Sequence, residues 1–333
     1  MKHYLLNFAY LFVLVGILSS CQTNDDLQNV DKMNTSDIAT KAMRRTLTNA
    51  EAQSLKVDFP SLNTNNVTVT GEADYSYNCI AWSLGISWRW INPPKNIYDF
   101  EYLYNNAKKL ENAIYNYSTG SIYSNADIFG FGISSADMKH ASIYYSGNMY
   151  ESKLGQDFRI THDKYGIEGG IYGYISIAFD RSYMRNITPE KIAGLKELAR
   201  LVEEENVISE DEKENIRLIV SKLDVNRSKF DNLFAAWKSD WQTNPKTRYS
   251  NNTNDAKTLD TFIPLVNMGK SIIPLLIEKL LEEENFFALT LYDELQGSIS
   301  QKITYDSADI EMLEGEQNRA KKTIRLWYSK LEK

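Results

Sequence analysis

The stretch Ser76–Arg89, SYNCIAWSLGISWR, places a cysteine directly in front of a short apolar run. Asn78 precedes Cys79, and the residues up to Leu84 follow with helix-like spacing. An extended segment is therefore expected to turn into a helix at Cys79, where backbone N–H groups favour a thiolate over a thiol. The stretch predicts a helix over Cys79–Leu84 that begins with a nucleophile. A small, buried, inert cysteine is the competing interpretation.

Alternating runs around this stretch predict a sheet. Residues 57–183 are rich in Gly, Tyr and Ile, and alternation of apolar with polar residues is typical of strands. The predicted strands are Val67–Val69, Ala141–Tyr145, Phe158–Thr161 and Tyr172–Ala178. Ile97–Ile114 has helical spacing and is a second predicted helix. The first half of the chain is therefore expected to be an α+β domain, with N-terminal helices packed on an antiparallel sheet.

Two glycine-rich segments lie in the same region, FGFGISSAD at 129–137 and GIEGGIYGY at 166–174. Neither carries the Gly-Lys-Ser/Thr sequence of a phosphate-binding loop. Both are predicted to form turns beside a cleft.

Long helix-forming stretches replace this pattern after Asn186. Ser209-Glu210-Asp211-Glu212 fits a capping box. Apolar faces with helical spacing follow at residues 230–241, 259–297 and 321–331, and the part at 262–295 resembles one unit of a HEAT-type repeat. The expected organisation is a leader at 1–20, a polar tether at 21–50, an α+β domain at 51–185 and an all-α helical bundle or short HEAT-like domain at 186–333.

The N-terminus has the features of a secretory leader, with a basic start at Lys2, an apolar stretch from Phe8 to Leu18 and small residues before Cys21. The apolar stretch, about 15 residues, is shorter than the roughly 20 that a spanning helix needs. The sequence LSSC at 18–21 resembles the lipobox of bacterial lipoproteins, in which the cysteine is acylated. The acidic tether after it is similar to the surface-export signals of Bacteroidetes lipoproteins. These resemblances imply an envelope protein, in the outer membrane and exposed at the surface, that is anchored by lipid on Cys21.

Composition and charge narrow the class of protein. Of 333 residues, 43% are hydrophobic, which supplies a large core and excludes a disordered chain. The formal net charge is −7, and it becomes −8 when the leader is lost with Lys2. The sequence has no basic cluster, so nucleic acid is not an expected partner, and membrane contact is expected through the lipid.

Cys79 and two histidines are the candidates for catalysis. Once Cys21 carries lipid, Cys79 is left as a free thiol, and His140 and His162 fall in the same half of the chain. His140 opens HASIYYSGNMYESKLG, which alternates, turns at residues 146–148 and continues as a second strand. An imidazole on a rigid sheet that faces a cysteine on a helix is the arrangement that nucleophilic catalysis needs.

At these residues the sequence resembles the papain-like superfamily, and within it the NlpC/P60 and CHAP group of amidases and peptidases. It is also similar to an uncharacterised bacterial family with NCIAW, HA and SKLG elements, over about Val57 to Tyr183. The resemblance implies a papain-like fold in which Cys79 is the nucleophile and His140 the base. The third catalytic residue then falls near Glu151 or Ser152.

The sequence departs from the NlpC/P60 pattern around the nucleophile. Asn78 stands where that group has Asp, and Ile80-Ala81-Trp82 stand where it has Ser-Gly. Neither Glu151 nor Ser152 is the usual His, Asn or Gln, and His162 is a rival for the third position. The residues expected to contact substrate are Tyr75, Tyr77, Asn78 and His162.

We therefore expect a hydrolase of amide bonds in peptides or peptidoglycan stem peptides, without a cofactor. A zinc site built from Cys79, His140, His162 and Asp163 is not expected, because these residues lack the short paired spacings of such sites. The alternative is a non-catalytic surface lipoprotein in which an inactive papain-like scaffold carries a helical domain that binds a protein partner.

Overall fold

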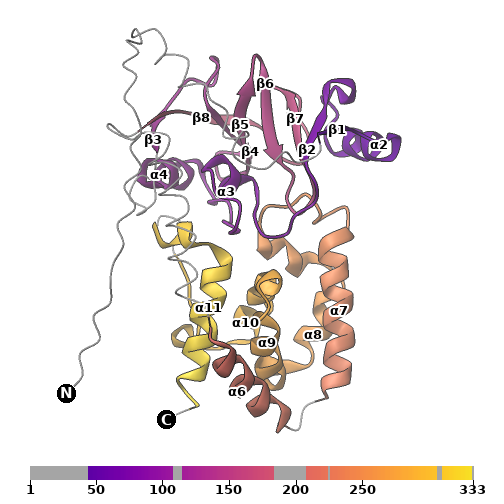
Figure 1. Cartoon of the computed structure of the whole chain (residues 1–333), viewed down its shortest axis with the longest axis vertical. Helices are drawn as coiled ribbons and strands as arrows, with labels where there is room; N and C mark the ends of the chain where they lie inside the picture. Colours follow the sequence, from indigo (N-terminus) through magenta and orange to yellow (C-terminus); the bar gives the residue numbers. More distant parts are fainter. Residues whose placement is uncertain (1–43, 108–114, 184–207, 224–225, 306–309, 332–333) are drawn as a thin grey trace, which may run out of the picture. The chain divides into compact units, whose positions relative to one another are not determined.

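The computed structural model describes residues 44–107, 115–183, 208–223, 226–305 and 310–331, which all belong to one compact unit (Figure 1). An antiparallel sheet comes first in the chain and a helical region follows it, so the expected α+β fold is confirmed at this level. The predicted leader, the lipidation site Cys21, most of the tether and the expected domain boundary at 185/186 lie outside the described residues.

The sheet has eight strands in the order β1-β2-β7-β6-β5-β4-β8-β3, and all neighbours are antiparallel. Its strands are β1 (Arg45–Thr46), β2 (Thr68–Gly71), β3 (Tyr115–Thr119), β4 (Ile128–Ser134), β5 (Asp137–Ser146), β6 (Met149–Lys153), β7 (Arg159–Asp163) and β8 (Tyr174–Tyr183). The four predicted strands correspond to β2, β5, β7 and β8, and the predicted turn after Ser146 leads into β6 as expected.

The prediction that residues 129–137 form a turn was wrong, because most of them form β4, between β5 and β8 in the sheet. The glycines there serve close packing. A Cβ on Gly130 would lie 2.6 Å from Ile177 and 2.8 Å from the Phe100 ring. Glycine therefore lets a helix and a neighbouring strand approach β4. The second glycine-rich segment forms turns before β8, as predicted.

The helices associated with the sheet are α2 (Asn49–Asp58), α3 (Cys79–Ser83) and α4 (Ile97–Ala107). Because Cys79 begins α3, the helix predicted from the opening stretch is confirmed. Helix α3 packs on β5 and β6, and α4 on β3, β5 and β8. The described part of α4 ends at Ala107, so the rest of the predicted helix at 108–114 cannot be compared.

The helical region begins with α6 (Glu210–Ser221), whose predicted capping box at Ser209 and Glu212 is present. The helices that follow are α7 (Arg227–Thr243), α8 (Phe262–Val266), α9 (Ile273–Leu280), α10 (Leu289–Leu295) and α11 (Gly315–Tyr328). Short 3-10 turns are η2 (Thr64–Asn66), η3 (Thr253–Thr258), η4 (Gly269–Ile272), η5 (Glu283–Ala288), η6 (Ile299–Gln301) and η7 (Ile310–Glu314).

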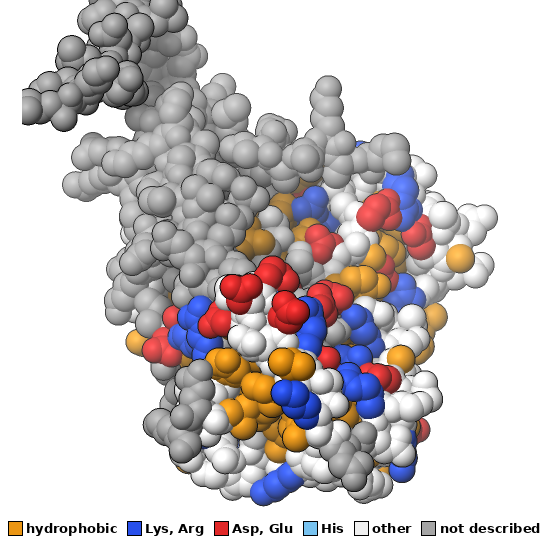
Figure 2. Space-filling model, turned by 60° about the horizontal axis from the view of Figure 1, so that its bottom comes forward, with side chains coloured by type: hydrophobic (Ala, Val, Ile, Leu, Met, Phe, Trp, Pro, Cys, Tyr) orange, Lys and Arg blue, Asp and Glu red, His pale blue; other side chains and the backbone are white. Residues whose placement is uncertain are grey.

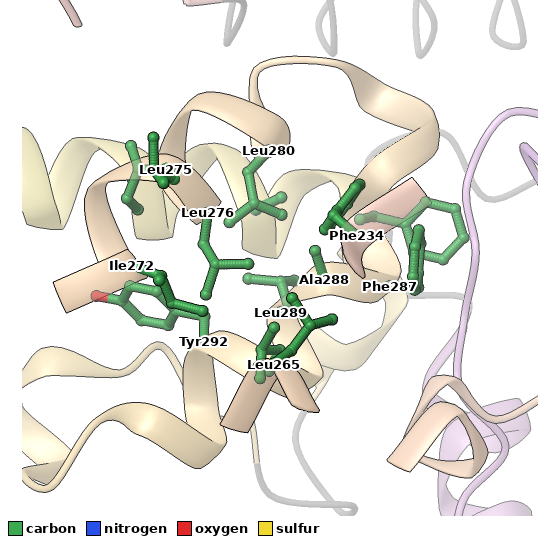
Figure 3. Close-up of a cluster of buried hydrophobic side chains, with 14 of the residues drawn as sticks. Phe234, Leu265, Ile272, Leu275, Leu276, Leu280, Phe287, Ala288, Leu289 and Tyr292 are labelled. Atoms are coloured by element: carbon green, nitrogen blue, oxygen red, sulfur yellow. The ribbon is translucent and has the colours of Figure 1, made fainter. Parts of the chain in front are cut away.

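A dense apolar core holds these helices together (Figure 3). Leu276, Leu289 and Phe287 are fully or almost fully buried within it. Burial of such side chains stabilises the fold by about 1.5–3 kcal/mol each. On the face shown in Figure 2, hydrophobic side chains gather in a patch, with a group of acidic side chains above it and basic side chains around both. None of the described helices is both long and apolar enough to cross a membrane.

Candidate active site around Cys79

The thiol of Cys79 lies against β5. Asn78 caps α3 by accepting a hydrogen bond from the Ala81 N–H (3.2 Å), which fixes where the helix begins. The Cys79 Sγ accepts a hydrogen bond from the backbone N–H of Ala141 (3.4 Å). Ala141 directly follows His140 in β5, so the structure brings the two residues predicted to be nucleophile and base to neighbouring positions.

A chain of hydrogen bonds runs from His140 across three strands. The Oγ of Ser152 on β6 lies 2.9 Å from the Nε2 of His140 on β5 and 2.8 Å from the Nε2 of His162 on β7. The Nδ1 of His162 lies 2.7 Å from the backbone carbonyl of Asp163. The predicted rival His162 therefore belongs to the same network and reaches His140 through Ser152.

The carbonyl at the end of this series of hydrogen bonds determines which group donates at each step. The Asp163 carbonyl accepts only, so His162 carries its proton on Nδ1 and its Nε2 accepts from the Ser152 hydroxyl. Ser152 must then accept from the Nε2–H of His140. The Nδ1 of His140 then carries no proton and can accept one, and this is the tautomer that a general base requires.

The side chain of Asn251, in the segment between α7 and η3, completes the site. Its Nδ2 lies 3.2 Å from the Nδ1 of His140 and 3.3 Å from the carbonyl of Lys139, and its Oδ1 accepts from the backbone N–H of Cys79 (3.4 Å). A single carboxamide therefore bridges the predicted base and the backbone donor beside the predicted nucleophile.

Cys79 and His140 approach β5 from different sides. Ala141 packs with Cys79 in one apolar cluster, whereas the ring of His140 stacks on Tyr172, which belongs to another. Consecutive side chains of a strand point to opposite faces, so the backbone of β5 lies between the thiol and the imidazole. The Asn251 carboxamide reaches both residues at this point.

The whole site is buried. Cys79, His140 and Ser152 are each 0% exposed. Burial raises the pKa of the Cys79 thiol above its ordinary value, and the hydrogen bond from Ala141 offsets only part of this. Burial also lowers the pKa of His140 well below its usual range, and the neighbouring His162 lowers it further. The site in this state holds a neutral thiol and a neutral imidazole.

The other predicted third residue, Glu151, lies away from His140. Its Oε2 accepts from the indole N–H of Trp82 (2.8 Å), and its Oε1 lies 3.8 Å from the Nε of Arg159, whose guanidinium covers the Trp82 ring at 3.9 Å. Adjacent strand residues face opposite sides of the sheet, so Glu151 faces α3 while Ser152 faces His140. In the structure Ser152, and not Glu151, contacts the imidazole.

Three predicted substrate contacts precede Cys79. Asn78 is buried and donates to the carbonyls of Ile91 (2.6 Å) and Asn251 (3.0 Å). Tyr77 is also buried, and burial raises the pKa of its hydroxyl to about 12. Tyr75 is 38% exposed on the loop before α3. Asn78 and Tyr77 thus serve internal contacts in this state, and Tyr75 is the one that faces solvent.

Lys153 of the SKLG element is a buried support for the site. Its Nζ donates to the carbonyls of Asp74 (2.8 Å), Gly155 (2.7 Å) and Asp157 (2.6 Å). Burial lowers the pKa of Lys153 to about 7. A neutral amine has two N–H donors and an ammonium has three, so three carbonyl acceptors favour the charged form. The lysine ties the loop before Cys79 to the loop after β6.

Sequence reasoning missed Asn251 and Tyr172. Both are common residue types, and Asn251 lies in the polar run SNNTN between two predicted helices. A run of this kind indicates a loop and carries no catalytic signal. Only tertiary contacts, over more than 100 residues of sequence, bring Asn251 to His140.

A cavity of about 460 Å³ lies near the site, and its lining does not include Cys79, His140, Ser152 or Asn251. Its lining includes Asn92, Met138 and Asn252, which lie close in sequence to Ile91, His140 and Asn251. Acidic and basic side chains, among them Glu316 and Arg319, form part of the same wall. Among the described residues, no group of three or more His, Cys, Asp or Glu is arranged to hold a metal ion.

Residues 68–180 match the model of a family described as a domain of unknown function (DUF7689). The match contains Cys79, His140, Ser152 and His162, and it ends before Asn251. Searches of curated proteins and of solved structures found no match.

Proposed function

We propose that this protein is a latent cysteine hydrolase of amide bonds, built on a papain-like sheet domain. One observation carries the proposal: the backbone N–H of Cys79 and the Nδ1 of His140 both contact a single carboxamide, the functional group on which an amidase acts. The tautomer of His140 supports it further, because Ser152 and His162 keep Nδ1 free to accept a proton.

The proposed reaction is acyl transfer through a thioester. In the closed state the backbone of β5 separates the thiol from the imidazole, so the proposed step requires that displacement of Asn251 lets the two side chains meet. His140 then takes the thiol proton as the Cys79 sulfur forms a bond to the amide carbon, and the Cys79 N–H donates to the developing oxyanion. The C–N bond then breaks, and the amine leaves with the proton from His140. Water attacks the thioester and loses a proton to His140, the C–S bond breaks to release the acid, and the proton passes from His140 to the sulfur, which restores the thiol. Peptide or peptidoglycan stem-peptide amides are the proposed substrates.

The experiment uses p-nitrophenyl acetate as an acyl donor and follows acylation of Cys79 by mass spectrometry. Acylation rates are compared between Asn251→Ala and the double variant that also carries His140→Ala, so that the side-chain contacts of Asn251 are absent from both. Loss of general-base catalysis in the double variant is expected to lower the acylation rate by about a hundredfold. An unchanged rate would mean that His140 does not activate Cys79.

A non-catalytic role is the second candidate, and the burial of the thiol favours it. Cys79 is 0% exposed and its pKa is raised, as for a cysteine that only fills space. In this case the sheet domain is a scaffold, and the helical region carries the contacts to a protein partner. The acylation experiment separates the two candidates, because a scaffold cysteine gives no dependence on His140.

For location, we propose an outer-membrane lipoprotein, held by acyl chains on Cys21 and exposed at the cell surface. The LSSC sequence at 18–21 after an apolar leader supports this proposal. The acidic charge of the chain gives no attraction to anionic lipid, so the anchor must come from the acyl chains. Incorporation of labelled palmitate that disappears in Cys21→Ser is the expected result, and equal labelling of both proteins would contradict it.

A further inference from the structure

The segment between α7 and η3, residues 247–253, lies directly over the site, and we name it the strap. The carbonyl of Arg248 accepts from the N–H of Gln156 (3.1 Å), and the carbonyl of Tyr249 accepts from the hydroxyl of Tyr172 (2.8 Å). Thr253 is fixed by two hydrogen bonds to the side chain of Asn92 (2.9 and 3.0 Å). The strap is therefore held along its length by the sheet side of the molecule.

Gly155 of the SKLG element allows the strap to come this close. Its φ is +52°, and a Cβ at this position would lie 2.5 Å from the carbonyl carbon of Tyr249. Two independent reasons, the backbone conformation and the approach of the strap, thus require glycine here.

The carboxamide of Asn251 has only one satisfactory orientation. In the reverse orientation its NH₂ would face the N–H of Cys79 and its oxygen would face the carbonyl of Lys139, so that both contacts would be repulsive. In the observed orientation the oxygen accepts from the Cys79 N–H, as a substrate carbonyl would in the proposed reaction, and the nitrogen faces His140.

We infer that Asn251 is an internal pseudo-substrate and that the strap keeps the cysteine site closed until it is displaced. The pseudo-substrate role of Asn251 rests on the proposed function. Closure of the site by the strap does not, because it can be tested by measuring how fast the Cys79 thiol reacts. Displacement of Asn251 frees the Cys79 N–H and the His140 Nδ1 together.

The backbone of Asn251 makes a clean experiment possible. Its carbonyl accepts from the Asn78 side chain (3.0 Å) and the Trp90 indole (3.0 Å), and these bonds survive truncation of the side chain. Asn251→Ala therefore removes the carboxamide and leaves the strap attached. Asn254→Ala is the matched control, because Asn254 is exposed and lies in the adjoining η3.

The measurement is the rate at which iodoacetamide alkylates Cys79 in folded full-length protein, with thermal unfolding recorded in parallel. Asn251→Ala is expected to raise the rate at least about tenfold, because the strap loses its side-chain bonds to Cys79 and His140 and opens more often. Asn254→Ala is expected to leave the rate unchanged. Equal rates in wild type, Asn251→Ala and Asn254→Ala would overturn the inference.

A second variant, Asp157→Asn, tests the same inference if Asn251→Ala fails to fold. It removes the ion pair of Asp157 with Arg248 at the start of the strap, while Asn can still accept the bond from the Phe158 N–H. A faster alkylation in Asp157→Asn supports the inference, and an unchanged rate contradicts it. If alkylation accelerates but acylation shows no dependence on His140, the closure holds and the proposed hydrolase activity fails.

Discussion

The imidazole of His140 lies flat on the phenol ring of Tyr172, with ring centroids 3.9 Å apart and an angle of 7° between the planes. The hydroxyl of the same tyrosine donates to the carbonyl of Tyr249 in the strap. Tyr172 thus positions the candidate base and holds the segment that covers it. Through this one side chain, the orientation of His140 and the closure of the site are connected.

Tyr172→Phe keeps the stacking on His140 and removes the hydrogen bond to the strap. We expect a loss of about 1 kcal/mol in the free energy of unfolding, measured by urea denaturation, because a buried carbonyl loses its donor. Tyr174→Phe is the control, since Tyr174 is 62% exposed, and its stability should stay within about 0.5 kcal/mol of wild type. Equal losses in the two variants would argue against a link between Tyr172 and the strap.

Gly155→Ala is expected to destabilise the protein severely, by about 4 kcal/mol or more, since strain at positive φ adds to a clash with the strap backbone. Gly147→Ala provides the comparison: its φ is +59° and nothing lies within 4 Å of the added Cβ. That variant should lose only about 1–2 kcal/mol from backbone strain. The difference between the urea midpoints of the two variants measures the cost of the clash between the added Cβ at residue 155 and the strap.

Stability should fall on acidification in a window set by the buried histidines. Burial lowers the pKa of His162 from 6.5 to about 4. Between these values the unfolded chain binds a proton that the folded chain excludes, so stability is lost as the pH falls from about 6.5 to about 4. His140, with its pKa also lowered, adds to the same slope.

His162→Gln isolates this contribution, because glutamine keeps a polar group near Ser152 and does not titrate. The free energy of unfolding of the variant should depend less steeply on pH, by up to one proton, between pH values of about 6.5 and 4. Parallel pH profiles for the variant and the wild type would show that the fold does not lower the pKa of His162.

Lys153→Met should cost about 3 kcal/mol or more in unfolding free energy, because three carbonyls lose their buried donor. Lys139→Met is the matched control. Lys139 is partly exposed and pairs with Asp137 at the surface, so its loss should change stability by less than about 1 kcal/mol. Similar losses of unfolding free energy in Lys153→Met and Lys139→Met would contradict the supporting role of Lys153.

Local patterns predicted most of the elements but not how the site is closed. Alternation located β2, β5, β7 and β8, and the Asn-Cys boundary located the start of α3. Strand β4 was missed because Gly130 and Gly132 suggest turns, whereas in the fold they admit neighbouring side chains. Propensity cannot separate these two uses of glycine, because the difference lies in partners that are distant in sequence.

The sequence predicted which residues form the candidate site, but it did not predict that the site is buried or that Asn251 contacts it. Spacing placed Cys79 and His140 in one region, and in the structure the Cys79 thiol contacts Ala141, the residue next to His140 in β5. Asn251 of the strap contacts both Cys79 and His140 and comes from outside the sheet part of the sequence. A polar loop residue gives no sign of its final neighbours, so the closed state could not be inferred from the sequence.

The most direct test of the proposed catalytic pair is the pH dependence of Cys79 alkylation in Asn251→Ala, with and without His140→Ala. If the pair is active, the single variant will show an alkylation midpoint well below the reference thiol pKa of about 8.5, and removal of His140 will move it upward. A midpoint at or above that reference value in both proteins, with the fold intact, would contradict a cysteine hydrolase.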